Sequence, residues 1–314
     1  MDSHSIRHVS HANIDVQKWD QCINSASNGL IYAYSFYLDR MAKHWDALVL
    51  DDYVAVMPLT WNKKAGLYYL FQPAFTPSLG VFGNRLDGTI VKEFILSIPG
   101  KFRLIDINLN AENNLEELNH PFFHSIIRKN YVLPLKRDYN QLYTNFSENI
   151  KRNIKRSVAF GCIVKKDIPI NDVVKLAKDQ LSNLTNLKEQ DFENFTSLYG
   201  ELSLRKQACT YGILHNNQLL SSAVYFFSNG RAYYILVGNH PNGKTMGTSH
   251  YLIDRFIADH AGNDLILDFE GSDISSLAFF YSSFGSTPEY YPALLMNRLP
   301  WYVRWRKKSI GNRQ

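Results

Sequence analysis

The residues best suited to chemistry lie in a strand, turn and helix predicted over Tyr233–His260. The strand is expected at Tyr233–Val237, and the helix begins at Thr248. Free N–H groups and the positive end of the helix dipole meet at such a helix start, which therefore binds phosphate and other anions. We predict cofactor contacts from the turn and the first helical residue: Asn242, Gly243, Lys244, Thr245, Met246, Gly247 and Thr248.

The same segment satisfies the phosphate-loop pattern GxxxxGK[ST] over Gly238–Thr245 (GNHPNGKT). An apolar strand ending in an acid, Leu265–Asp268, would suit the magnesium of a nucleotide hydrolase. Short turns ahead of the loop predict antiparallel strands, however, whereas phosphate-loop domains have parallel sheets. Few residues follow the loop, and Pro241 removes one amide donor. Nucleotide hydrolysis is therefore the lesser interpretation of this segment.

Several side chains are candidates for moving protons. Asp268 and Glu270 are two residues apart on a predicted strand and would share one face. Glu270, near the end of that strand, is a candidate catalytic base, directly or through water. His240 in the turn and His250 in the helix are candidate bases or phosphate neighbours. Each also has a structural explanation, as a hydrogen-bonded acid or a packed histidine.

A basic amphipathic helix is predicted over Tyr139–Gly161, with apolar residues at a spacing of four: Leu142, Phe146, Ile150 and Ile154. Gly161 supplies the helix stop. Four cationic residues of this helix are candidates for holding an anionic donor or a phosphodiester: Lys151, Arg152, Lys155 and Arg156. The simpler explanation is that they form a solvated helix face.

The composition excludes several classes of protein. Of the 314 residues, 45% are hydrophobic and 20% charged, as in soluble globular proteins. The net charge of +5 is too small for a dedicated nucleic-acid binder. No apolar run has the length of a membrane span, and the N-terminus lacks the apolar core of a signal peptide. The three cysteines lack metal-ligand spacing, so no metal site is expected: Cys22, Cys162 and Cys209. Together these features predict a cytoplasmic protein.

The expected elements fall into two halves of similar order. The first reads β-α-α-β-β-β-α-β-β, with residues 112–129 irregular or weakly helical. The second reads β-α-(α)-β-β-β-α-β-α-β, and the tail Trp301–Lys308 is predicted to pack as an aromatic, basic lid. This order predicts an α+β fold with mostly antiparallel sheets flanked by helices, in two domains, residues 1–138 and 139–314.

The order of the second half resembles that of the GNAT acyltransferases. Two motifs resemble the Fem-type members: SENIKRNIKRSVAFGCIVKK, similar to the basic helix that opens their second domain, and LDFEGSDISSLAFFYSSFG, similar to their closing segment. The residues that match the closing segment are Phe269, Gly271, Phe280, Phe284 and Gly285. This resemblance covers roughly Ser147–Met296; for residues 1–135 it rests on element order.

The resemblance implies a tandem GNAT fold with an N-terminal domain of structural or substrate-binding role. It also implies an N-acyltransferase whose donor is acyl-coenzyme A, with its pyrophosphate at the Lys244 turn, or aminoacyl-tRNA. The acceptor would be an amine on a small molecule or a cell-wall precursor, held between the domains. Tyr281, four residues before Gly285, would be the catalytic acid. The turn departs from the GNAT consensus Gln/Arg-x-x-Gly-x-Gly/Ala, and Tyr281 replaces a Fem-type lysine; an inactive GNAT-fold binding protein is therefore the alternative.

Overall fold

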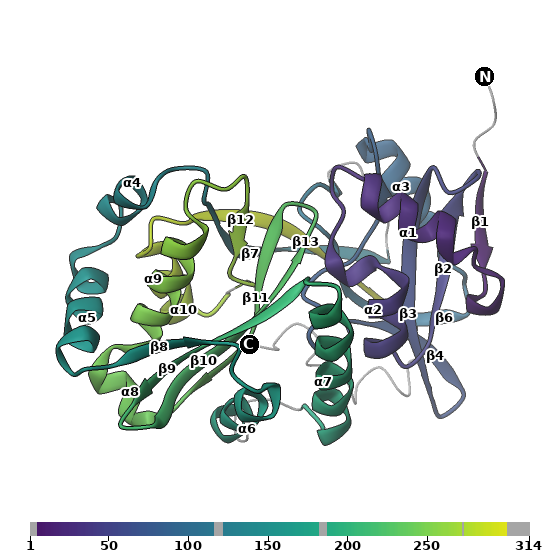
Figure 1. The fold of residues 1–314 in the computed structure, drawn as a ribbon. Coiled ribbons are helices and arrows are strands. Elements are labelled where there is room, and N and C mark those ends of the chain that lie inside the picture. Colours follow the sequence, from purple (N-terminus) through teal and green to yellow (C-terminus); the bar gives the residue numbers. More distant parts are fainter. Residues whose placement is uncertain (1–4, 116–121, 182–186, 272, 300–314) are drawn as a thin grey trace. The chain divides into compact units, whose positions relative to one another are not determined.

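The computed structural model describes residues 5–115, 122–181, 187–271 and 273–299 (Figure 1). The described residues up to Lys129, together with those from Tyr290 onward, form one compact unit, and Asn130–Glu289 forms a second. This division lies earlier in the chain than the predicted boundary at 138/139, and it returns the last strand to the first unit. The predicted lid at Trp301–Lys308 lies outside the described residues.

The first unit is built on an antiparallel meander that continues into a parallel strand. Its elements are β1 (Ile6–Val9), α1 (Val16–Ser25), α2 (Ser35–Met41), β2 (Trp45–Leu50), β3 (Ala55–Lys64), β4 (Leu67–Phe71), α3 (Gly88–Leu96) and β6 (Phe102–Asn108). The strands follow the order β1-β2-β3-β4-β6, and the short β5 (Phe82–Gly83) pairs with β3. Only the β4–β6 pair is parallel, because α3 carries the chain back across the sheet.

The second unit repeats this order. After α4 (Tyr139–Thr144) and α5 (Glu148–Ala159) come β8 (Ile163–Lys166), α6 (Ile170–Leu181), α7 (Glu189–Leu204), β9 (Ala208–His215), β10 (Gln218–Ser228), β11 (Arg231–Asn239), α8 (Pro241–Met246), α9 (Thr248–His260), β12 (Ile266–Asp268) and α10 (Ser275–Ser282). The strands follow the order β8-β9-β10-β11-β12, and the pair β11–β12 is parallel.

Two strands contain the points at which the chain passes from one unit to the other. Strand β7 (Phe123–Pro134) follows β6 in sequence, yet it pairs with β12 of the second unit, with Leu133 opposite Leu267. Strand β13 (Thr287–Asn297) follows α10, yet it pairs with β6 of the first unit, with Leu294 opposite Ile107. The chain therefore crosses between the units twice, within these two strands.

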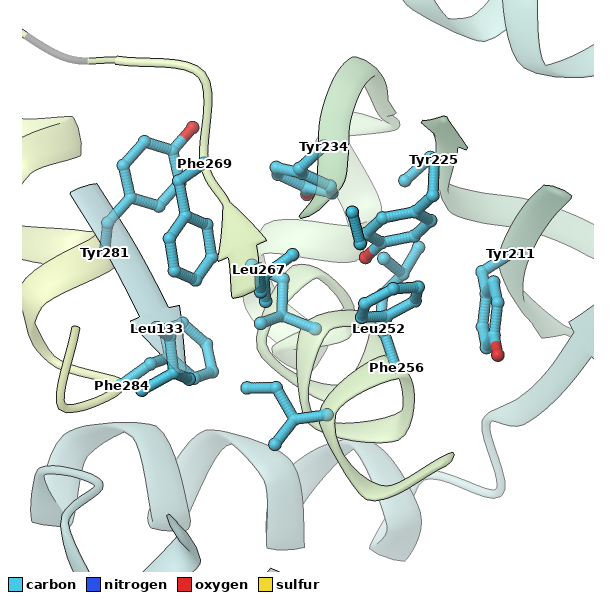
Figure 2. Packing of buried hydrophobic residues seen from close by; sticks show 14 of the residues in the cluster. Leu133, Tyr211, Tyr225, Tyr234, Leu252, Phe256, Leu267, Phe269, Tyr281 and Phe284 are labelled. Carbon is cyan, nitrogen blue, oxygen red and sulfur yellow. The ribbon is translucent and has the colours of Figure 1, made fainter. Parts of the chain in front are cut away.

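Helix α9 buries one side against the sheet of the second unit. Tyr225 on β10 and Phe256 on α9 stack with ring centroids 3.7 Å apart (Figure 2). Strands β9, β11 and β12 and helices α5 and α10 add side chains to the same core. Helix α6 packs on β11 so closely that a Cβ on Gly238 would lie 2.7 Å from the Ala177 nitrogen. Two helical layers thus enclose this sheet.

The first unit has a core of its own. Its centre consists of fully buried side chains from β3, α3 and β6, among them Leu59, Phe94, Phe102 and Ile105. Leu294 and Met296 of β13 belong to the same cluster. The predicted α+β fold class, a mixed sheet flanked by helices, is confirmed.

Two predicted segments differ in detail. The helix expected over Tyr139–Gly161 is two helices, α4 and α5, because Ser147 caps a new helix by accepting a hydrogen bond from the Ile150 N–H (3.4 Å). The residues expected to be irregular or weakly helical before Lys129 include the first half of β7. Ile126 and Ile127 are both exposed there, so the strand lacks the alternation by which a half-buried strand is recognised.

Candidate functional site

The parallel pair β11–β12 opens at one end. The pairing covers only Arg231–Tyr233 against Ile266–Asp268, after which β12 ends while β11 continues to Asn239. Among the described strands, β11 from Tyr234 onward pairs only with β10. The chain leaves β12 through Glu270 (φ 63°) and Gly271 (φ 100°), both left-handed. The pairing of the two strands therefore ends next to Glu270, a candidate catalytic residue.

Tyr281 lies on α10 at this opening. Its ring stacks on Phe269, with centroids 4.7 Å apart, and its hydroxyl points away from the aliphatic centre of the core (Figure 2). Burial and then the negative charge of Glu270 raise the pKa of Tyr281 to about 12. The phenol therefore keeps its proton at neutral pH, as a general acid must.

Glu270 is placed differently from its prediction. Strand β12 ends at Asp268, so Asp268 and Glu270 do not share a strand face. Asp268 is buried, and its Oδ2 accepts a hydrogen bond from Arg231 Nη1 at 2.9 Å. Glu270 is half-buried and close enough to Tyr281 for its charge to act on the phenol. The negative charge of Glu270 thus acts on Tyr281, the other predicted catalytic side chain.

His250 in the first turn of α9 packs edge-on against Phe280 of α10, with ring centroids 5.0 Å apart. Burial, followed by the charge of Arg156, lowers the pKa of His250 to about 4. The imidazole is therefore neutral at pH 7 and a weak base. Arg156 on α5 donates from Nη1 to the Thr245 carbonyl oxygen at 3.3 Å. Helices α5, α8, α9 and α10 converge through these contacts.

The predicted turn Asn242–Gly247 is instead the short helix α8, joined to α9 by Gly247. Gly247 has φ 73°, and a Cβ there would lie 2.6 Å from the Asn153 carbonyl oxygen. Thr248 is fully buried and its hydroxyl bonds Ser221 Oγ at 2.5 Å. Gly243 is buried too, Met246 is half-buried, and the exposed residues of the set are Asn242, Lys244 and Thr245.

The phosphate-loop interpretation of Gly238–Thr245 is wrong. Strand β11 ends at Asn239, and His240 caps α8 by accepting the Asn242 N–H on Nδ1 at 3.2 Å. The Gly243 N–H donates to the His240 carbonyl oxygen at 2.9 Å. A phosphate loop needs such amides aimed together at a phosphate, whereas here they close a helical turn.

The four cations of α5 do not form one cluster. Lys151 pairs with Glu148 at 3.0 Å, and Arg152 donates to Asn149 Oδ1 at 2.8 Å. Lys155 is exposed. Arg156 reaches α8, so it is the α5 cation nearest to the candidate site among the described contacts.

Sequence reasoning missed a polar network beneath Glu270. It comprises one residue from each of four strands: Asn130 of β7, Arg231 of β11, Asp268 of β12 and Glu289 of β13. Asp268 stood out in the sequence as the polar end of an apolar strand, whereas Asn130 directly follows Arg128 and Lys129 and carries no such signal. Their partners are distant in sequence, which a single pattern cannot reveal.

Within the described ranges, no three histidine, cysteine or acidic side chains are grouped so as to hold a metal ion. No helix in those ranges combines the length and apolarity needed to cross a membrane.

No family model matches the sequence, and no curated protein matches it significantly. Solved structures do match. FemX superposes with a TM-score of 0.66 at 13% identity, covering 96% of this chain and 99% of FemX. The C-terminal domain of a putative lysylphosphatidylglycerol synthetase from Agrobacterium fabrum gives 0.54 at 11% identity, covering 90% and 92%. L-PGS from Bacillus licheniformis gives 0.50 at 10% identity, covering 83% and 86%. The chain has the GNAT-like fold of Fem-type proteins, as its sequence predicts.

Proposed function

We propose that the second unit transfers an acyl or aminoacyl group to an amine. The observation that carries this proposal is the position of Tyr281, whose ring stacks on Phe269 where β12 ends, next to the turn that holds Glu270. An acid beside a carboxylate provides both proton transfers that acyl transfer to an amine requires. The likeness to FemX supports the fold on which this chemistry is proposed.

In the proposed reaction, an amine replaces the thiol or alcohol group of the donor. The amine nitrogen attacks the carbonyl carbon of the donor and loses a proton to Glu270, directly or through water. The bond from carbon to the leaving thiolate or alkoxide then breaks, and Tyr281 gives that group its proton. An amide forms, a thioester or ester is consumed, and the proton on Glu270 is returned to solvent while Tyr281 is reprotonated.

The proposed donor is acyl-coenzyme A, with aminoacyl-tRNA as the alternative. Both carry phosphates, and the exposed Lys244 and Thr245 of α8 are the proposed contacts. Arg156, which already reaches α8, would add a fixed positive charge. His240 and Lys155 are secondary candidates.

The proposed acceptor is an amine on a small molecule or a cell-wall precursor. One structural neighbour bears a name that denotes an aminoacylated lipid, lysylphosphatidylglycerol, which supports acceptors of cell-envelope type. The repeated element order of the two units supports the further proposal that they are tandem GNAT-like domains, of which the first binds the acceptor or has a structural role.

Thermal unfolding with candidate donors tests the donor class. A ligand at 100 times its Kd adds about 2.7 kcal/mol of stability. Acetyl-coenzyme A, aminoacyl-tRNA, uncharged tRNA and Mg-ATP are added separately. We expect a raised Tm with acetyl-coenzyme A, or with aminoacyl-tRNA beyond uncharged tRNA. Stabilisation by Mg-ATP alone contradicts acyl transfer, and no response to any of them favours a binding protein that has lost the chemistry.

Tyr281→Phe tests the catalytic acid. It removes only the hydroxyl, so we expect kcat to fall at least tenfold while the donor still binds, measured as kcat and donor Kd. Tyr211→Phe is the matched control: it removes a hydroxyl that bonds Asp259 at 2.9 Å elsewhere in the same core. Equal turnover of the Tyr281 variant and the wild type would exclude the acid role.

A further inference from the structure

The polar network beneath Glu270 is anchored on Arg231. Its Nη2 donates to Glu289 Oε1 at 2.7 Å, and its Nη1 donates to Asp268 Oδ2 at 2.9 Å. Asn130 Nδ2 donates to the other oxygen of Asp268, Oδ1, at 2.8 Å. The guanidinium thus balances two carboxylates and holds their oxygens in fixed directions.

Two backbone amides of the turn after β12 bind to this network. The Glu270 N–H donates to Asp268 Oδ1 at 2.9 Å, and the Gly271 N–H donates to Asn130 Oδ1 at 2.6 Å. Asn130 also accepts the Tyr131 N–H at 2.8 Å, which fixes the orientation of its amide. Consecutive N–H groups of one turn are therefore held by side chains from two different strands.

The conformation of Glu270 explains why such bonds are needed. Its φ of 63° is left-handed, a region that side chains other than glycine and asparagine rarely adopt. Backbone strain of this kind persists only where the surroundings fix it, and it concentrates at functional sites. An extended residue at this position would continue β12 and direct its own side chain differently.

We propose that Asn130 is a positioning residue which, together with Asp268, clamps the Glu270–Gly271 backbone and so directs the Glu270 carboxylate toward Tyr281. The inference rests on the proposed function for its catalytic consequence, and on the hydrogen bonds alone for the clamp. Asn130 is the first residue of the second unit and Glu289 the last, so the clamp is built where the chain enters and leaves that unit.

Hydrogen exchange tests the clamp without requiring activity. In Asn130→Ala, we expect the Glu270 and Gly271 amides to exchange at least tenfold faster, while the α9 amides keep their wild-type rates. Tyr139→Phe is the control, because it removes a hydrogen bond of comparable burial, to Asp254 Oδ1 at 2.5 Å, away from Glu270. Unchanged exchange at Glu270 and Gly271 would overturn the clamp. If Asn130→Ala does not fold, Asn130→Ser is measured in the same way.

Kinetics with acetyl-coenzyme A, or with the donor identified by thermal unfolding, test the consequence. We expect Asn130→Ala to lower kcat at least tenfold with donor KM changed less than about threefold, and to have no further effect in a Glu270→Gly background. Additive effects of the two substitutions would show that Asn130 does not act through Glu270. Faster exchange with wild-type kcat in both single variants would retain the clamp and reject Glu270 as the base.

Discussion

Tyr281 and His250 lie on neighbouring helices, and burial acts on them in chemically opposite ways. Burial disfavours the charged form of each, which raises the pKa of the phenol and lowers the pKa of the imidazole. Both groups are therefore neutral at pH 7, and Tyr281 is the one with a proton to give. His250 serves better as a packing partner of Phe280 than as a base.

The lowered pKa of His250 predicts a loss of stability in acid. The unfolded chain binds a proton near pH 6.5, and the folded chain resists protonation down to about pH 4, so stability falls as pH falls through this window. At pH 5 the cost is about 2 kcal/mol. We expect His250→Gln to lose less stability than wild type between pH 7 and pH 5, measured by urea unfolding. Parallel losses in both proteins would contradict the prediction.

The junction between α8 and α9 lies just after Lys244 and Thr245, the candidate anion contacts. Gly247 ends α8 and precedes α9 in a left-handed conformation, while Asn153 of α5 occupies the space where a side chain would project. Gly243 is restricted in the same way, since a Cβ there would lie 2.5 Å from Thr248 Oγ1. These glycines are required by packing, and Lys244 and Thr245 between them remain exposed at the surface.

Gly247→Ala tests this junction. We expect a loss of about 2–4 kcal/mol in the free energy of unfolding, because the substitution combines a left-handed alanine with a backbone clash. Gly200→Ala is the matched control: Gly200 is exposed in α7 with open space around its Cα, and helix propensity predicts a gain of about 0.5–1 kcal/mol. Chemical denaturation measures both, and equal effects would refute the packing argument.

At the scale of the whole molecule, the two units share one order of elements, and the last strand of the chain pairs in the first unit. β1-α1-α2-β2-β3-β4-α3-β6 corresponds to β8-α6-α7-β9-β10-β11-α9-β12, with α8 added before α9. β7 follows the first of these two series but pairs with β12 of the second. β13 follows the second series but pairs with β6 of the first. The first unit therefore depends on residues from both ends of the chain, and a cut at one boundary cannot separate the units.

Leu294→Ala tests the assignment of β13 to the first unit. Leu294 is fully buried among side chains of β3 and β6, so we expect a loss of about 2–5 kcal/mol. Hydrogen exchange should quicken in β3 and β6 more than in α9. Phe256→Ala is the counterpart in the second unit and should quicken α9 and β10 first. The reverse pattern for Leu294→Ala would contradict this assignment.

The sequence alone determined most of the order of elements and the fold class, because both depend on the periodicity of local segments. The aromatic residues around Tyr281 came from the resemblance of one segment to Fem-type proteins. The sequence did not determine which strands pair, because Leu133 and Leu294 would be equally apolar in either unit. It also missed that Glu270 is left-handed and that Asn130 accepts the neighbouring Gly271 N–H, since both depend on contacts between residues far apart in the chain. Tertiary structure decided these features, and the catalytic geometry proposed for Tyr281 and Glu270 depends on them.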